Sequence, residues 1–79
     1  MKNLIELSHT ELVLAFAASC IESVARRLGI PYQEVFARMK HVGMIENYIL
    51  PYYDILHTES REHVTDNMLE CLTTWEAKQ

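Results

Sequence analysis

The chain has 79 residues and a formal net charge of −4, with 49% hydrophobic and 23% charged residues. Such a short chain buries only about 60% of the surface that it exposes when unfolded, so its core is thin. The composition is that of a globular protein and excludes a disordered or low-complexity chain. We expect residues 1–79 to form one domain, to which self-association would add stability.

The charge is unevenly distributed along the chain. Residues 1–43 contain five Lys and Arg against four Asp and Glu, whereas residues 44–79 contain two against seven. The second half therefore repels nucleic acid and favours a basic partner. No stretch reaches the roughly 20 apolar residues of a membrane span, and the first residues lack the apolar run of a signal peptide. We expect a cytoplasmic protein that does not enter a membrane.

The best-specified element is a helix over residues 9–28. Ser8 and Glu11 have the spacing of a capping box, in which each side chain binds the backbone N–H of the other residue. Gly29 is placed to end the helix in the left-handed conformation. Apolar residues recur at steps of three and four and predict one buried stripe, made of Val13, Phe16, Ala17, Cys20, Ile21, Val24 and Leu28.

A second helix is predicted between Pro31, which suits a first helical turn, and Gly43. Its inward-facing residues are Val35, Phe36, Met39 and Val42. A third segment follows, until Pro51 removes a backbone donor and clashes with the preceding turn, which predicts a break. The apolar face of this segment consists of Met44, Ile45, Tyr48 and Ile49.

Residues 52–56 are expected to form a short turn of their own, before a last helix capped by Ser60 or Thr65. The apolar face of that helix consists of Val64, Met68, Cys71, Leu72 and Trp75. No segment shows the two-residue alternation of a half-buried strand. The sequence therefore predicts an all-α fold, a small bundle of four to five helices with a break near Pro51.

The His, Gly and Cys residues do not have the spacing or the neighbours of a metal, phosphate-binding or catalytic site. The four histidines lack the two- or four-residue pairing with Cys or His that marks a metal site. The two glycines cannot form a phosphate-binding loop. Cys20 and Cys71 stand beside no basic residue that would activate a thiol, and we expect both to be buried. We therefore expect no metal, no cofactor and no enzymatic activity.

One pattern is typical of DNA-binding proteins. Ala25, Gly29 and Val35 have the spacing of a helix-turn-helix, in which a small residue, a glycine and a buried apolar residue shape the corner. A helix-turn-helix over residues 25–41 would bring four basic residues near phosphates, namely Arg26, Arg27, Arg38 and Lys40. Any tight corner between two helices requires the same three residue types, and the acidic second half opposes nucleic-acid binding.

Aromatic residues concentrate in the second half of the chain. A thin core cannot hide several large rings, and aromatic residues with a polar edge are enriched at protein interfaces. We expect core packing to account for most of the set. The residues predicted to reach a partner-binding surface are Tyr48, Tyr52 and Trp75.

The residues from Tyr53 to Thr58 read Tyr-x-x-Leu-His-Thr. In this run, and in the apolar pattern of residues 11–72, the chain resembles a family of short uncharacterised bacterial and phage proteins. Members of that family are domains of unknown function, often encoded beside toxin-like proteins that resemble ADP-ribosyltransferases. The resemblance implies an antitoxin or an accessory protein. Residues 59–64 are more polar than the family pattern, so no function is placed on them.

The same run also has an interpretation from its residues alone. After the break at Pro51, Tyr53 and Leu56 can point to one side of a single turn, while His57 and Thr58 leave it. The imidazole and the hydroxyl can then bind backbone groups that are freed where one helix ends and the next begins. This structural corner is the favoured interpretation, and contact with a partner is the alternative.

These features predict a protein-interaction module that binds a partner protein of basic character through its acidic second half and its exposed aromatic residues. A homo-oligomer is also expected. The alternative is a DNA-binding regulator that uses residues 25–41. The two roles can coexist in an antitoxin that represses its own operon.

Overall fold

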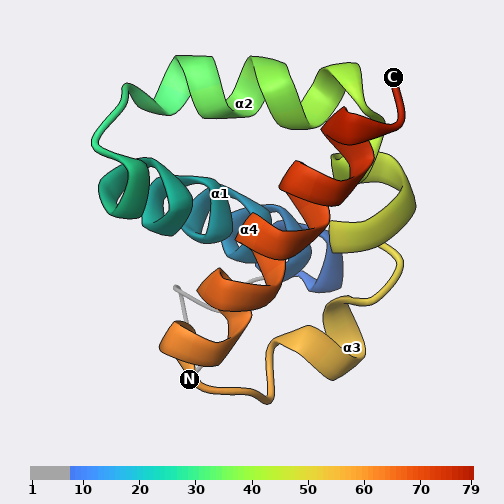
Figure 1. The fold of residues 1–79 in the computed structure, drawn as a ribbon. Helices are drawn as coiled ribbons and strands as arrows, with labels where there is room; N and C mark the ends of the chain where they lie inside the picture. The colour runs from blue at the N-terminus through green and yellow to red at the C-terminus, as the bar shows by residue number, and fades with distance from the viewer. Residues whose placement is uncertain (1–7) are drawn as a thin grey trace, which may run out of the picture.

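The computed structural model describes residues 8–79, which form five helical elements. Their bounds are α1 His9–Leu28, α2 Tyr32–His41, η1 Ile45–Ile49, α3 Tyr53–Leu56 and α4 Arg61–Ala77 (Figure 1). Within residues 8–79 there is no strand, so the all-α prediction is confirmed. The predicted helix over residues 9–28 is confirmed residue for residue as α1.

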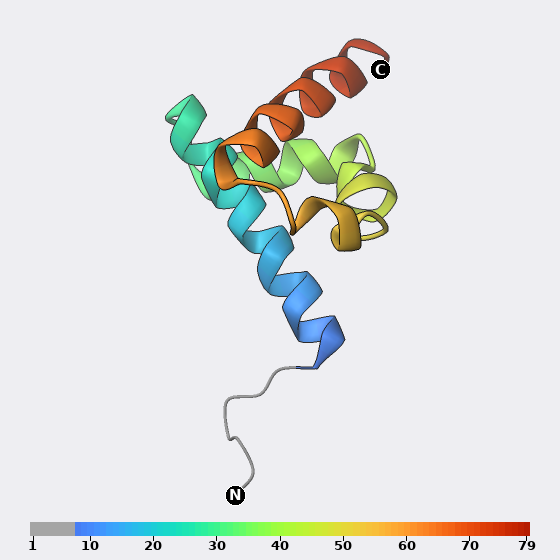
Figure 2. The ribbon, with the colours of Figure 1, turned by 90° about the horizontal axis from the view of Figure 1, so that it is seen from below.

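The other elements are arranged around α1. It contacts both α2 and α4, while η1 contacts α2. In Figure 1, α2 lies above α1 and α4 crosses in front of it. Figure 2 shows the first turns of α1 extending beyond the other helices. The buried apolar side chains, which come from all five elements and from the turn before η1, form one hydrophobic cluster.

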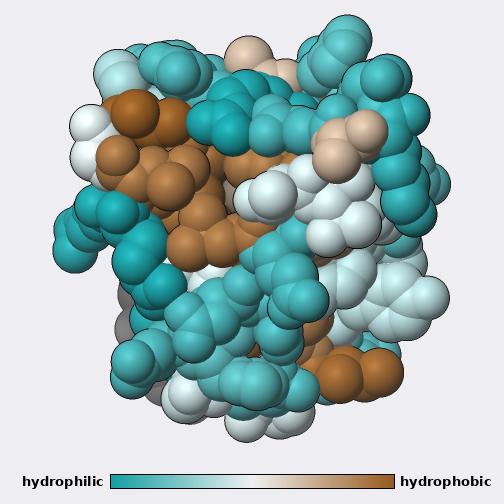
Figure 3. All heavy atoms as spheres, in the orientation of Figure 1, coloured by the Kyte–Doolittle hydropathy of each residue, from teal (hydrophilic) through white to brown (hydrophobic). Residues whose placement is uncertain are grey.

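The local signals of α1 act as predicted. Ser8 Oγ accepts a hydrogen bond from the Glu11 N–H at 3.2 Å, and Glu11 Oε1 accepts one from the Ser8 N–H at 2.9 Å. Gly29 ends the helix with a left-handed φ of 70°. Leu28 is 41% exposed, contrary to its predicted burial, because the chain turns away directly after it. Figure 3 shows apolar atoms at the surface between this end of α1 and α2.

α2 buries a narrower face than predicted. It begins at Tyr32, and Pro31 is the residue before its first turn. Val35 and Met39 are fully buried, because residues four apart share a helix face and this face packs on α1. Phe36 lies about 100° around the helix from Val35. It is 40% exposed, so its assignment to the core is wrong.

The third segment is a single turn of π-helix. The Leu50 N–H donates to the Ile45 carbonyl, five residues back, at 3.0 Å. This spacing places Met44 and Ile49 on the same side of the turn, and both are fully buried. The π-helix ends before Pro51, which confirms the predicted break. α3 is then one short turn whose last residue is buried.

α4 begins after Ser60, whose Oγ accepts a hydrogen bond from the His63 N–H at 3.1 Å. Thr65, the other candidate cap, is instead buried within the helix, and its hydroxyl donates to the Arg61 carbonyl at 2.8 Å. Of the two candidates, Ser60 is therefore the cap. The apolar residues that α4 buries in the core are Val64, Met68 and Leu72.

Both cysteines are free thiols, Cys20 buried in α1 and Cys71 partly buried in α4. Burial raises the pKa of both thiols, and at Cys20 the hydrogen bond and charge of Arg61 oppose this rise. A thiol that stays protonated is a poor nucleophile.

Among residues 8–79, no helix combines the length and the apolar character needed to cross a membrane.

Candidate functional site

Three predicted interface residues lie together where η1 and the turn after it meet α4. The ring centroid of Tyr48 lies 6.4 Å from that of Trp75 and 5.9 Å from that of Tyr52, with tilted or edge-on planes. Tyr48 and Trp75 are partly buried and pack against the core, whereas Tyr52 is 48% exposed. We call Tyr48, Tyr52 and Trp75 the aromatic face. Two of its rings are fixed by the core, and the third is open to solvent.

Negative charge accompanies the aromatic face. Burial is the main cause that raises the pKa of Tyr48, and Cys71, Glu59, Cys20 and Glu70 add to the rise in that order. The phenol therefore stays neutral and can donate and accept hydrogen bonds. An aromatic ring beside carboxylates attracts Lys and Arg side chains, through both the ring quadrupole and the opposite charge. A shallow hollow continues this surface, lined by Val42, Trp75, Lys78 and Gln79.

The run from Tyr53 to Thr58 forms a corner, but not with the bonds expected of it. Tyr53 meets the Phe16 ring edge-on at 5.4 Å, and Leu56 is buried. Thr58 Oγ1 donates to the Ile55 carbonyl at 2.8 Å, as expected. The exposed His57 imidazole makes no hydrogen bond within residues 8–79. It stacks on the Tyr53 ring at 4.4 Å instead, so the expected bonds from His57 to the backbone are not found.

The corner between α1 and α2 buries Ala25 and Val35 and turns at the left-handed Gly29, as the spacing of these residues predicts. Its basic residues, however, do not form one free basic surface. Arg26 pairs with a glutamate one turn earlier at 2.8 Å, and Arg27 pairs with an aspartate of α4 at 2.7 Å. Phosphate binding by these arginines would compete with carboxylates of the chain itself.

Arg38, the third arginine of that set, joins α2 to α4. Its Nε and Nη2 donate to the two carboxylate oxygens of Glu76, each at 2.8 Å. These hydrogen bonds lower the pKa of Glu76 and raise that of Arg38. Lys40, the remaining candidate, has its Nζ 6.0 Å from the Phe36 ring centroid. The structure thus gives Arg38 a role in holding two helices together.

A family model described as "protein of unknown function (DUF3791)" matches residues 15–75. The chain belongs to this family. The matched region includes the aromatic face and the run from Tyr53 to Thr58. No curated protein and no solved structure matches the chain.

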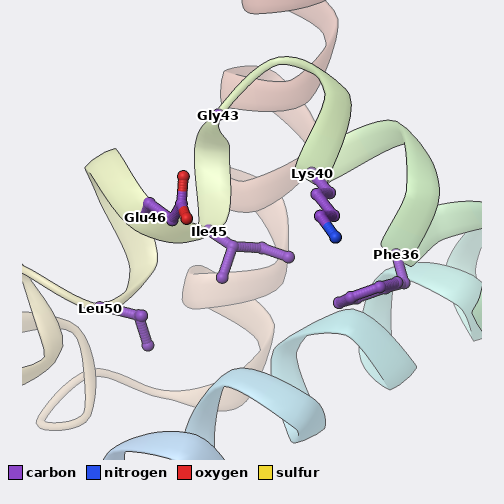
Figure 4. A pocket seen from close by; sticks show the side chains of 6 residues that line it. All are labelled: Phe36, Lys40, Gly43, Ile45, Glu46 and Leu50. Carbon is purple, nitrogen blue, oxygen red and sulfur yellow. The ribbon is translucent and has the colours of Figure 1, made fainter.

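The DUF3791 chain also carries an apolar pocket that its sequence does not reveal. The pocket lies between α2 and η1 and has a volume of about 220 Å³ (Figure 4). The apolar pattern assigns Phe36 and Ile45 to the core, and no local signal separates a core residue from one that lines a pocket. The lining residues are Phe36, Lys40, Gly43, Ile45, Glu46 and Leu50.

A second feature without a sequence signal is the contact of Arg61 with α1. Arg61 Nη2 donates to Ser19 Oγ at 2.8 Å, and its guanidinium carbon lies 5.8 Å from the Phe16 ring centroid. The first residue of α4 is thereby tied to a residue 42 positions earlier. Within residues 8–79, no group of three or more His, Cys, Asp or Glu side chains is placed to hold a metal ion.

Proposed function

We propose that this DUF3791 chain is a small helical protein-interaction module that binds a basic segment of a partner protein at the aromatic face. The observation that carries the proposal is the exposed ring of Tyr52 beside the core-anchored rings of Tyr48 and Trp75. Rigid aromatic residues of this kind are enriched among those that dominate binding energy. The proposed activity is binding, without catalysis.

Charge supports a basic partner. Glu59 and Glu70 lie near enough to Tyr48 to affect its pKa. Residues 44–79 hold seven acidic residues against two basic ones, and within residues 8–79 five of the seven remain unpaired with Lys or Arg once Asp66 and Glu76 bind Arg27 and Arg38. A Lys or Arg side chain that stacks on an exposed ring gains about 0.5 to 2 kcal/mol, depending on how far it is desolvated. The negative field also speeds the encounter with a basic surface and makes it sensitive to salt.

A finer proposal concerns the identity of the partner. The resemblance carried by the run from Tyr53 to Thr58 implies a toxin-like partner similar to ADP-ribosyltransferases. On that basis the chain would act in the cytoplasm as an antitoxin or accessory protein, holding the toxin-like protein at the aromatic face. Co-expression tests this proposal, because the chain should relieve the growth inhibition caused by such a protein.

One pair of matched variants tests the proposed surface. The tagged chain captures proteins from an extract of its host, and the captured protein is then purified and titrated calorimetrically with each variant. Tyr52→Ser should weaken binding about tenfold or more, because it removes the open ring of the aromatic face. Tyr32→Ser is the control, since Tyr32 is 39% exposed but lies on α2.

The proposal fails if Tyr52→Ser binds as tightly as the wild type, or if Tyr32→Ser weakens binding equally. Raising the salt concentration supplies a second measurement. Binding that depends on the acidic surroundings should weaken as salt screens them. Affinity independent of salt would contradict a basic partner.

DNA binding is the second candidate function, and it rests on the helix-turn-helix spacing of Ala25, Gly29 and Val35. In that case Arg26, Arg27, Arg38 and Lys40 would contact phosphates. Binding would then fall steeply with added salt, because phosphate contacts release counterions. A gel-shift titration of duplex DNA at low ionic strength, followed by an operator screen, tests this alternative. Absence of retardation in both removes it.

A further inference from the structure

The pocket between α2 and η1 is apolar at its centre. Phe36 is 40% exposed, and Ile45 and Leu50 are partly exposed. A space of about 220 Å³ between such side chains leaves apolar surface in contact with water. Covering that surface is favourable, and a chain with a thin core has particular need of it. None of these residues belongs to the aromatic face.

The residues that line the pocket are arranged as two sides about Ile45. Phe36 and Lys40 lie on one side, and Leu50 and Glu46 lie on the other (Figure 4). Lys40 and Glu46 are both exposed, and neither takes part in an ion pair within residues 8–79. The pocket thus has a positive side and a negative side around an apolar centre.

This arrangement is self-complementary. In a two-fold symmetric dimer both copies use the same surface. If one residue contacts a second residue of the other copy, then the second residue of the first copy makes the same contact in return. A two-fold axis that passes by Ile45 and separates the two sides brings Lys40 of one protomer opposite Glu46 of its partner. The same axis brings Phe36 opposite Leu50. We infer that the chain forms a homodimer through this pocket, with Ile45 of both protomers at the centre.

Charge selects a second copy over other occupants. A basic segment in the pocket would be attracted by Glu46 but repelled by Lys40, and an acidic segment would meet the reverse. A second copy satisfies both charges at once and also covers the apolar centre. The homodimer is independent of the proposed function, because the aromatic face uses Tyr48, Tyr52 and Trp75.

Charge-reversal variants test the homodimer. Lys40→Glu puts two carboxylates opposite each other and Glu46→Lys puts two ammonium groups together, so each variant alone should dimerise about tenfold more weakly or worse. An equimolar mixture of the two variants should regain tight association as a heterodimer, because every contact then joins opposite charges. Sedimentation equilibrium gives the dissociation constants. Native mass spectrometry with one variant isotope-labelled identifies the heterodimer.

Two control variants test whether the interface lies at the pocket. Lys78→Glu changes the net charge as Lys40→Glu does, but lies outside the pocket, and it should leave dimerisation unchanged. Tyr52→Ser should also leave it unchanged. The inference is overturned if the wild type stays monomeric at high micromolar concentration, or if the mixture associates no more tightly than either variant. It is also overturned if Tyr52→Ser abolishes the dimer, because the aromatic face would then be the interface.

Discussion

Residues 8–29 contain one long helix and residues 42–60 contain two short helical elements, and different forces hold the two regions in shape. α1 has a capping box at Ser8 and a left-handed Gly29 at its end, so its bounds follow from local hydrogen bonds and backbone conformation. Residues 42–60 contain one turn of π-helix, a break at Pro51 and one turn of α-helix. Turns as short as these are unstable alone, since forming the first turn costs more entropy than one hydrogen bond returns.

The burial of apolar side chains stabilises residues 42–60, whose short turns are unstable alone. Met44, Ile49 and Leu56 are spread along this region and all three are buried in the common core. Met44 and Ile49 anchor the π-helical turn at its two ends, and Leu56 anchors α3. α1 is therefore specified mainly by its own sequence, whereas residues 42–60 keep their shape because the rest of the chain covers them. The two regions should therefore respond differently to substitution.

The largest effect is expected from Ile49→Ala. Ile49 is fully buried, and the variant loses both the transfer free energy of the removed atoms and the contacts around the cavity they leave. The free energy of unfolding should fall by about 2 to 5 kcal/mol. Urea denaturation measures it. Leu14→Ala on the exposed part of α1, where Leu14 is 56% exposed, is the control and should change stability by about 0.5 kcal/mol or less. Equal losses in the free energy of unfolding would contradict the proposed difference between the two regions.

A second contrast is offered by the two glycines, which share a left-handed φ, 70° at Gly29 and 75° at Gly43. A Cβ at Gly29 would meet no atom within 4 Å, so Gly29→Ala should cost only the backbone strain, about 1 kcal/mol. A Cβ at Gly43 would lie 2.9 Å from Asn47 Nδ2, which also donates to the Gly43 carbonyl. Gly43→Ala should therefore cost about 2 kcal/mol. Chemical denaturation that ranks Gly29→Ala as the costlier variant would contradict this account.

Ser8→Ala should have a smaller and more local effect. It removes the acceptor of the Glu11 N–H, and the loss of such a cap typically costs about 1 kcal/mol. The first turns of α1 extend beyond the other helices, although the His9 ring meets the Tyr53 ring of α3 edge-on at 5.7 Å, so we expect fraying there and little change elsewhere (Figure 2). Amide hydrogen exchange should rise in the first turn of α1 but not in residues 42–60. Faster exchange throughout the chain would show that the cap supports more than its own helix.

The smallest effect is expected from His57→Ala. Its imidazole is exposed and stacks on Tyr53 without a hydrogen bond to the backbone within residues 8–79. Stability should fall by about 0.5 kcal/mol or less, as at other exposed positions. Thermal unfolding measures the change. A loss above about 1 kcal/mol would instead indicate that His57 satisfies buried backbone groups at the corner.

The candidate site was predictable in part. The expectation that Tyr48, Tyr52 and Trp75 share a surface rests on their type and on the size of the core, and the structure brings all three together. Helical spacing predicts that Phe36 and Leu28 are in the core, yet both are about 40% exposed. Spacing identifies the apolar face of a helix, but not how much of that face a neighbouring element covers.

The contacts of the basic residues are also not predictable from the local sequence. Arg38 has the character of a phosphate ligand in the sequence, and only the folded chain brings Glu76 against both of its donor nitrogens. Arg61 likewise finds Ser19 from a position 42 residues away. Ion pairs and hydrogen bonds between residues so far apart in the sequence depend on how helices cross, which no local pattern encodes.

Local sequence explains the bounds of α1 and the break at Pro51, because caps, glycines and prolines act over one helical turn. It also explains the absence of strands among residues 8–79, since no segment alternates with a period of two. Tertiary packing sets the remaining features. It closed residues 45–49 as a π-helix, so that Met44 and Ile49 could both enter the core. It also left Phe36 and Ile45 lining a pocket, because burial depends on which surfaces meet when the helices pack.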